Sequence, residues 1–70
     1  MKIATYNVNS INARIENLIN WLKMEHPDVV LLQEIKCDFN SFPFFDLQAV
    51  GYEAKILGQK SYNGVAVLSR

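Results

Sequence analysis

Residues 27–36 have the sequence Pro-Asp-Val-Val-Leu-Leu-Gln-Glu-Ile-Lys, and this stretch does most to decide the fold. Its centre, Val29 to Leu32, is a run of four apolar residues without alternation. Such a run is typical of a strand that is buried on both faces of a sheet. Pro27 disfavours helix at the residue before it. We therefore predict a strand from Asp28 to Gln33 that begins just after a helix has ended.

The segments upstream predict a first strand and that helix. Residues 2–8 are rich in β-branched and aromatic types, which predicts a strand. Residues 12 or 13 to 25 predict an amphipathic helix, with Ser10 or Asn12 as its N-cap. The buried stripe of this helix is expected to contain Ile15, Leu18, Ile19 and Leu22. Strand, helix and strand within about thirty residues predict a βαβ unit with parallel strands and a right-handed crossover.

The segments downstream complete a four-stranded sheet. Residues 35–50 predict a loop with one short helix over residues 46–50, ahead of Gly51. Residues 52–57 and 64–69 predict two further strands, and the pair Asn63-Gly64 favours a tight turn between them. One helix and a short turn cannot cover both faces of such a sheet. We therefore expect these residues to form part of a larger layered domain.

Composition and charge exclude several classes of protein. Seven basic residues balance seven acidic ones, which argues against binding of nucleic acid by bulk charge alone. The only cysteine, Cys37, cannot form an intrachain disulfide, and we expect it to be an inert packing residue. The only histidine, His26, is expected to be a helix-terminal residue and not a ligand. No apolar segment approaches the length of a membrane span, so we expect a soluble, cytoplasmic protein.

Polar side chains follow both strands of the predicted βαβ unit. Strand parity puts Asn7 and Asn9 on one face at the carboxyl end of the first strand, and Glu34 follows the second. The carboxyl ends of parallel strands meet at one sheet edge, where open α/β sheets bind ligands. Oxygen ligands with a single carboxylate suit Mg²⁺ or Mn²⁺. The alternative is that the asparagines only form a turn and that Glu34 is simply solvated.

Several segments also resemble a known family. Residues 1–14 and 27–36 are similar to the corresponding segments of bacterial exonuclease III-type DNA-repair enzymes. Phe42-Pro43, Gly51-Tyr52 and residues 58–66 resemble that family in the same order and with similar spacing. The pattern Leu-Gln-Glu-x-Lys is typical of the wider endonuclease/exonuclease/phosphatase superfamily. The resemblance covers essentially the whole chain.

The resemblance implies a fold, an activity and a set of site residues. It implies an α/β fold, a four-layer sandwich of two mixed sheets, in which residues 1–70 are the N-terminal part of a single domain. It implies a Mg²⁺-dependent phosphodiesterase that cuts duplex DNA at abasic sites and 3′ ends as a monomer. Asn7 and Asn9 would belong to the catalytic centre, and Asn7 and Glu34 to the metal site, with Glu34 as the direct ligand. Lys36 would support the loop that carries Glu34. The residues expected near the DNA backbone are Arg14, Lys36, Lys60 and Tyr62, and the alternative for Arg14, Lys60 and Tyr62 is solvation and loop packing alone.

The chain departs from the family pattern in ways that leave alternatives open. Tyr6, Asn12, Ile35 and Ser61 stand where Trp, Arg, Thr and Gly are common. The family's later half supplies a catalytic tyrosine, an Asp and Asn, and an Asp-His pair, none of which these residues contain. We therefore expect the 70-residue chain alone to be inactive. One alternative is a phosphodiesterase that acts on another ester, such as an inositol phosphate or a lipid, and another is a non-catalytic remnant.

Overall fold

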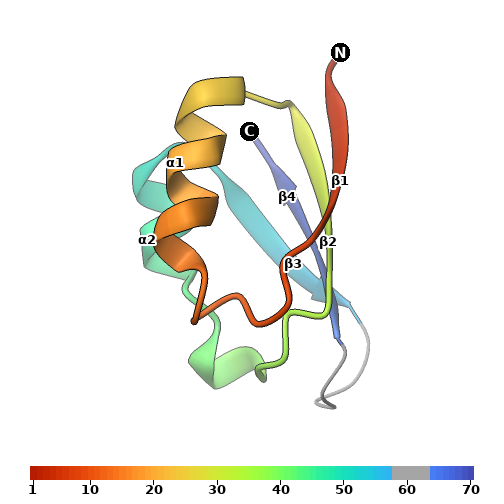
Figure 1. The fold of residues 1–70 in the computed structure, drawn as a ribbon, viewed down its shortest axis with the longest axis vertical. Helices are drawn as coiled ribbons and strands as arrows, with labels where there is room; N and C mark the ends of the chain where they lie inside the picture. Colours follow the sequence, from red (N-terminus) through yellow and green to blue (C-terminus); the bar gives the residue numbers. More distant parts are fainter. Residues whose placement is uncertain (58–63) are drawn as a thin grey trace.

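Four strands form a single mixed sheet in a computed structural model that describes residues 1–57 and 64–70 (Figure 1). The strands are β1 (Ile3–Asn7), β2 (Val29–Gln33), β3 (Glu53–Leu57) and β4 (Val65–Ser69), in the order β1-β2-β4-β3. β1 pairs with β2 in parallel, while β4 is antiparallel to both β2 and β3. The four predicted strands and the parallel β1–α1–β2 unit are confirmed. The predicted turn at Asn63-Gly64 falls partly outside the described residues.

The helix α1 (Ile15–Glu25) connects the two parallel strands and begins later than its apolar pattern predicts. Residues 11–14 form a turn first, in which Arg14 N–H donates to Ile11 C=O at 3.2 Å. The N-cap is Arg14 without a side-chain cap, so the prediction of Ser10 or Asn12 is wrong. Asn12 instead donates to Ser41 C=O at 3.0 Å, which ties this turn to a distant loop. The helix ends as predicted before Pro27, with His26 as a left-handed C-cap.

Two short helices follow β2. A 3₁₀ helix, η1 (Phe39–Ser41), was not predicted, and the side chain of Asp38 caps it by accepting from Ser41 N–H at 3.0 Å. The helix α2 (Phe44–Ala49) begins two residues earlier than predicted, directly after Pro43. Proline suits the start of a helix because its missing N–H has no intrahelical partner there. The predicted stop ahead of Gly51, which has a positive φ of 96°, is confirmed.

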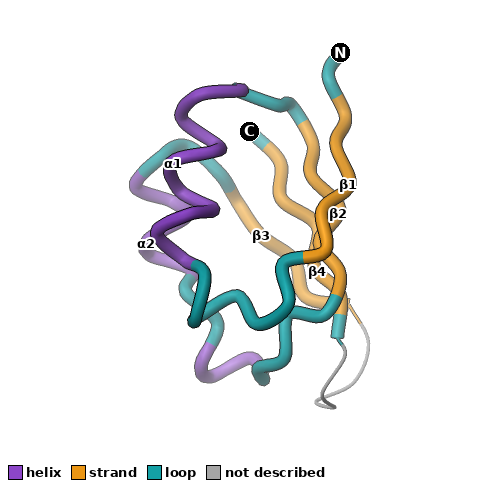
Figure 2. The backbone as a smooth tube through the Cα atoms, in the orientation of Figure 1, coloured by secondary structure: helices purple, strands orange, loops and turns teal. Residues whose placement is uncertain are grey.

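The hydrophobic core lies between the helices and one face of the sheet. Figure 2 shows α1 and α2 on the same side of the four strands. The core side chains from β2 and β4, Val30, Leu32, Ala66 and Leu68, are buried with Leu18 and Leu22 of α1 and Leu47 of α2. Tyr6 packs against this layer by stacking on Trp21, with ring centroids 5.3 Å apart. Of the predicted stripe of α1, Leu18 and Leu22 therefore belong to the core, whereas Ile15 and Ile19 are only partly buried beside it.

The opposite face of the sheet is uncovered in the described residues. Ile3, Leu31 and Val65 point to this face and are 61%, 41% and 39% exposed. Within the described residues, positions 29–32 therefore alternate between a covered and an open face, and burial on both faces stays a prediction for the larger layered domain. The mixed α/β class is confirmed. No helix in the described part of the chain is long and apolar enough to cross a membrane.

Candidate active site

The loops after β1 and β2 continue the parallel pairing beyond the strands themselves. Val8 N–H donates to Gln33 C=O at 3.1 Å, Ser10 N–H to Glu34 C=O at 2.8 Å, and Ile11 N–H to Ile35 C=O at 3.0 Å. The two loops are thus held side by side at the carboxyl ends of the strands. This brings the backbone around Asn7, Asn9 and Glu34 together at one sheet edge, which is the arrangement that the βαβ prediction requires.

Backbone strain is concentrated in these same two loops. Among the described residues, five non-glycine residues have a positive φ, and four of them lie here. They are Asn9 (47°), Ser10 (81°), Glu34 (56°) and Lys36 (55°). A left-handed conformation costs a residue with a Cβ roughly 1–3 kcal/mol, and such residues cluster at functional sites. The fifth, His26, is the ordinary left-handed cap of α1.

The left-handed backbone at Glu34 changes which side chain enters the core. Along β2, Val30 and Leu32 are buried, so strict alternation would bury residue 34 next. Instead Ile35 is fully buried, and the side chain of Glu34 is 41% exposed. The carboxylate is therefore available at the sheet edge and is not forced into the apolar core, where an isolated charge is costly.

Asn7, Asn9, Glu34 and Lys36 form a connected polar group. Asn7 Oδ1 accepts from the backbone N–H of Asn9 at 3.1 Å, which closes a local turn. The Lys36 ammonium donates to Asn9 Oδ1 at 2.8 Å and lies 3.9 Å from Glu34 Oε1. The three residues predicted for the site thus lie in one network, and a fourth residue, Lys36, joins its two halves.

The donor chemistry of this group fits a hard divalent cation. Glu34 offers a partly exposed carboxylate and Asn7 offers an amide oxygen, which are ligands that Mg²⁺ and Mn²⁺ accept while they keep several waters. Within residues 1–57 and 64–70, no group of three or more His, Cys, Asp or Glu side chains is placed to hold a metal ion. The described residues therefore fit a magnesium-type site with few protein ligands, and not a zinc site of the closed kind.

The remaining predicted residues have separate outcomes. Arg14 is exposed at the start of α1, and the described residues include no hydrogen bond from its side chain to the polar group. Lys60 and Tyr62 lie outside the described residues. Burial raises the pKa of the Cys37 thiol, and the charge of Asp38 raises that pKa further. A thiol of this kind is a poor nucleophile, which agrees with a packing role for Cys37.

Gln33 is a polar contact of this edge that the sequence analysis did not single out. Its Nε2 donates to Thr5 Oγ1 at 2.8 Å and to Leu31 C=O at 3.1 Å. Gln33 is the parallel partner of Asn7 in the β1–β2 register. Strand parity could have found it, because residues 29, 31 and 33 share the face that carries Thr5 and Asn7.

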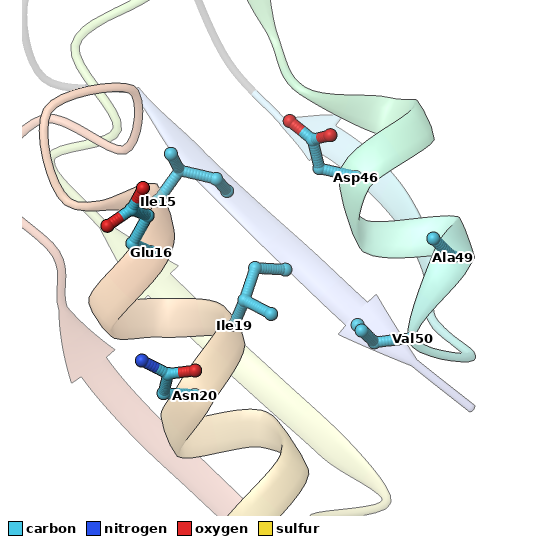
Figure 3. Close-up of a pocket in the computed structure, with 7 residues that line it drawn as sticks. All are labelled: Ile15, Glu16, Ile19, Asn20, Asp46, Ala49 and Val50. Carbon is cyan, nitrogen blue, oxygen red and sulfur yellow. The ribbon is translucent and has the colours of Figure 1, made fainter.

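A separate groove of about 560 Å³ lies between α1 and α2. Figure 3 shows Ile15 and Ile19 of α1 on one side of it, and Asp46, Ala49 and Val50 on the other. None of its lining residues is among those predicted for the site. Since the groove lies on the helical side of the sheet, it does not bear on the polar group described above.

The chain is similar in both sequence and fold to several known proteins. The profile of the Endonuclease/Exonuclease/phosphatase family matches residues 4–70. Exodeoxyribonuclease III of Haemophilus influenzae is 37% identical over 70 residues, which are all of this chain and 26% of that protein. An AP endonuclease from Archaeoglobus fulgidus is 45% identical with a TM-score of 0.92, over 99% of this chain and 27% of that one.

A further solved structure, the 3′ phosphatase NExo from Neisseria bound to a product DNA hairpin, is 48% identical with a TM-score of 0.91. The similarity covers 100% of this chain and 27% of that one. The chain therefore spans about a quarter of the length of each of these relatives. The likeness concerns both sequence and fold, and it extends over both loops of the polar group.

Proposed function

Because the chain belongs to the endonuclease/exonuclease/phosphatase family, we propose that it is the N-terminal part of a single-domain DNA repair nuclease. The proposed enzyme hydrolyses phosphodiesters of duplex DNA at abasic sites and at 3′ ends, with Mg²⁺ or Mn²⁺ as cofactor. The observation that carries this proposal is the polar group of Asn7, Asn9 and Glu34 on two strained loops held at one sheet edge. The enzyme is proposed to act as a cytoplasmic monomer.

The proposed roles follow from the chemistry of each side chain. Glu34 would be the direct ligand of the cation, and Asn7 would complete the protein's share of the metal site. When bound, such a cation neutralises the charge that develops on the phosphate and orients its oxygens. Asn9 would contact the phosphate through its amide. The residues that activate the attacking water would belong to the part of the proposed domain that lies beyond residue 70.

The function and the role of Glu34 can be tested together in the full-length protein. Glu34→Ala is expected to lower Mg²⁺-dependent cleavage of a duplex with one abasic site by about 100-fold or more, because preorganised charge at the phosphate is lost. Glu53→Ala is the matched control, since Glu53 is an exposed carboxylate on β3. Chelation of divalent ions should abolish cleavage by the unmodified protein. Undiminished cleavage by the Glu34 variant would exclude the role of Glu34.

A phosphodiesterase of the same family with another substrate is the second candidate. DNA is favoured because the relatives that share 37–48% identity with this chain are an exodeoxyribonuclease, an AP endonuclease and a DNA-bound 3′ phosphatase. A substrate panel would compare abasic duplex DNA, duplex DNA with a recessed 3′ end, an inositol phosphate and a phospholipid. Turnover of only the last two would overturn the proposed substrate while leaving the family unchanged.

A further inference from the structure

Besides the backbone hydrogen bonds, a side-chain ammonium group also links the two loops of the candidate site. The Lys36 Nζ donates to Asn9 Oδ1 at 2.8 Å, across 27 positions in the sequence. It also lies 3.9 Å from Glu34 Oε1. Asn9 belongs to the loop after β1, whereas Glu34 and Lys36 belong to the loop after β2. Lys36 therefore connects the proposed metal ligand to the proposed phosphate contact.

This contact is of a strong kind and is made by a strained residue. A hydrogen bond from an ammonium group to an amide oxygen is shorter and stronger than one between neutral groups. Lys36 donates this hydrogen bond while its own backbone is left-handed, with a φ of 55°. Its side chain is 38% exposed, so the charge keeps part of its hydration. A lysine whose only role was to contact the DNA backbone would need neither the strained backbone nor the hydrogen bond to Asn9.

The bond determines which part of the Asn9 amide is free. A side-chain amide carries an acceptor oxygen and a donor NH₂ group on opposite sides. With Oδ1 held by the ammonium group of Lys36, the NH₂ group is directed away from it. An unrestrained amide could rotate and present its oxygen to an anion, which would repel it. The ammonium group therefore makes Asn9 a dedicated hydrogen-bond donor.

We propose that Lys36 is a positioning residue that orients the Asn9 amide, so that Asn9 Nδ2 donates to a non-bridging oxygen of the scissile phosphodiester. This inference rests on the proposed function and gives Lys36 a role inside the site in place of a direct contact with the DNA backbone. It requires that Lys36 acts through Asn9, and this requirement has a structural and a kinetic consequence.

The structural consequence can be measured without substrate or metal. In ¹⁵N-labelled full-length protein, relaxation of the Asn9 side-chain NH₂ group reports whether that group is held. Lys36→Met is expected to convert the ordered Asn9 NH₂ group into a mobile one, and Lys36→Arg is expected to keep it ordered. Lys23→Met, which removes an exposed lysine from α1, is the control and should change nothing. An Asn9 amide that stays equally ordered in Lys36→Met would overturn the proposal.

The kinetic consequence is non-additivity between Lys36 and Asn9. Lys36→Met is expected to lower kcat for abasic-site cleavage about 10- to 100-fold, with KM little changed, as for other groups that orient a catalytic side chain. If Lys36 acts through Asn9, the double variant with Asn9→Ala is no slower than the slower single variant, within about threefold. Lys36→Arg should recover most of the activity. Multiplicative losses, with a raised KM for Lys36→Met, would identify a direct DNA contact and overturn the proposal.

The two measurements separate this inference from the proposed function. If the unmodified full-length protein does not cleave DNA, the proposed function fails. The relaxation of the Asn9 amide still decides whether Lys36 orients it. The other case is that the protein cleaves DNA and requires Glu34, but the losses from Lys36→Met and Asn9→Ala multiply in the double variant. The proposed function then stands, and the role assigned to Lys36 is rejected.

Discussion

At the scale of single residues, backbone conformation decides what the sheet edge presents to a ligand. Glu34 adopts a left-handed conformation with a φ of 56°, and this lets Ile35 enter the core while the carboxylate stays partly exposed. Glycine adopts this conformation without strain, whereas alanine does not. Glu34 therefore occupies a position where glycine would be less strained, and strained residues of this kind cluster at functional sites.

This strain predicts an unusual order of stability at position 34. Glu34→Gly should have a free energy of unfolding about 1 kcal/mol higher than Glu34→Ala, because only the alanine variant keeps the left-handed strain. Urea denaturation of the full-length protein measures the difference. The control pair, Asn20→Gly and Asn20→Ala in the middle of α1, should show the opposite order by a similar amount. If alanine were more stable than glycine at both positions, Glu34 would not be strained.

The candidate site could be predicted from the sequence in part. Parity and parallel strands place Asn7 and Glu34 at one edge, because both follow strands of one βαβ unit. The bond between Lys36 and Asn9 could not be predicted in the same way. It depends on the left-handed backbone at Glu34 and Lys36, and no local propensity favours that conformation for these residue types.

At the scale of elements, a buried hydrogen bond joins two connections that are far apart in the sequence. The Tyr52 hydroxyl donates to Pro27 C=O at 2.6 Å, which links the start of β3 to the connection between α1 and β2. Burial raises the pKa of this hydroxyl further above neutral pH, where a tyrosine is a protonated donor in any case. The bond therefore joins the two connections that lead from α1 into β2 and from α2 into β3.

Removal of this hydroxyl should destabilise the fold. Tyr52→Phe leaves the Pro27 carbonyl without its partner in a buried place, and the expected loss in free energy of unfolding is about 1–3 kcal/mol. Tyr6→Phe is the matched control, since the Tyr6 hydroxyl makes no hydrogen bond within the described part of the chain and its ring stacks on Trp21 in either form. Chemical denaturation compares the two. Equal losses would show that the bond to Pro27 contributes nothing.

Elements were predicted more securely than their ends. The spacing of Leu18 and Leu22 determines α1 because the stripe must face a core. The start of α1 was predicted too early, since residues 11–14 form a turn whose Asn12 side chain bonds to Ser41. That bond joins segments 29 positions apart, so cap preferences within the helix could not reveal it.

At the scale of the whole molecule, the uncovered sheet face is the main feature. Ile3, Leu31 and Val65 expose 61%, 41% and 39% of their surface on a face that no described element covers. Burial of such side chains contributes about 1.5–3 kcal/mol each. The relatives are about four times as long as the part that matches this chain. We therefore propose that a second layer of the longer domain covers this face.

This proposal predicts different behaviour for the isolated chain and the longer protein. The isolated 70 residues should bind a hydrophobic dye, unfold without a sharp thermal transition and show no nuclease activity. In the longer protein, Leu31→Ala should lower the free energy of unfolding by about 2–5 kcal/mol, because the side chain is then buried. The control Met24→Ala, at a residue 73% exposed on α1, should have little effect. A cooperative transition for the isolated chain would contradict the proposal.

The sequence by itself determined the order and kind of the main elements and the meeting of Asn7 and Glu34 at one edge. These features depend on local periodicity and on the direction of parallel strands, which a linear pattern encodes. The tertiary structure alone decided the left-handed loops and the bond from Lys36 to Asn9. Those features arise from contacts between segments distant in the chain, whose energies outweigh the local preferences of the residues involved.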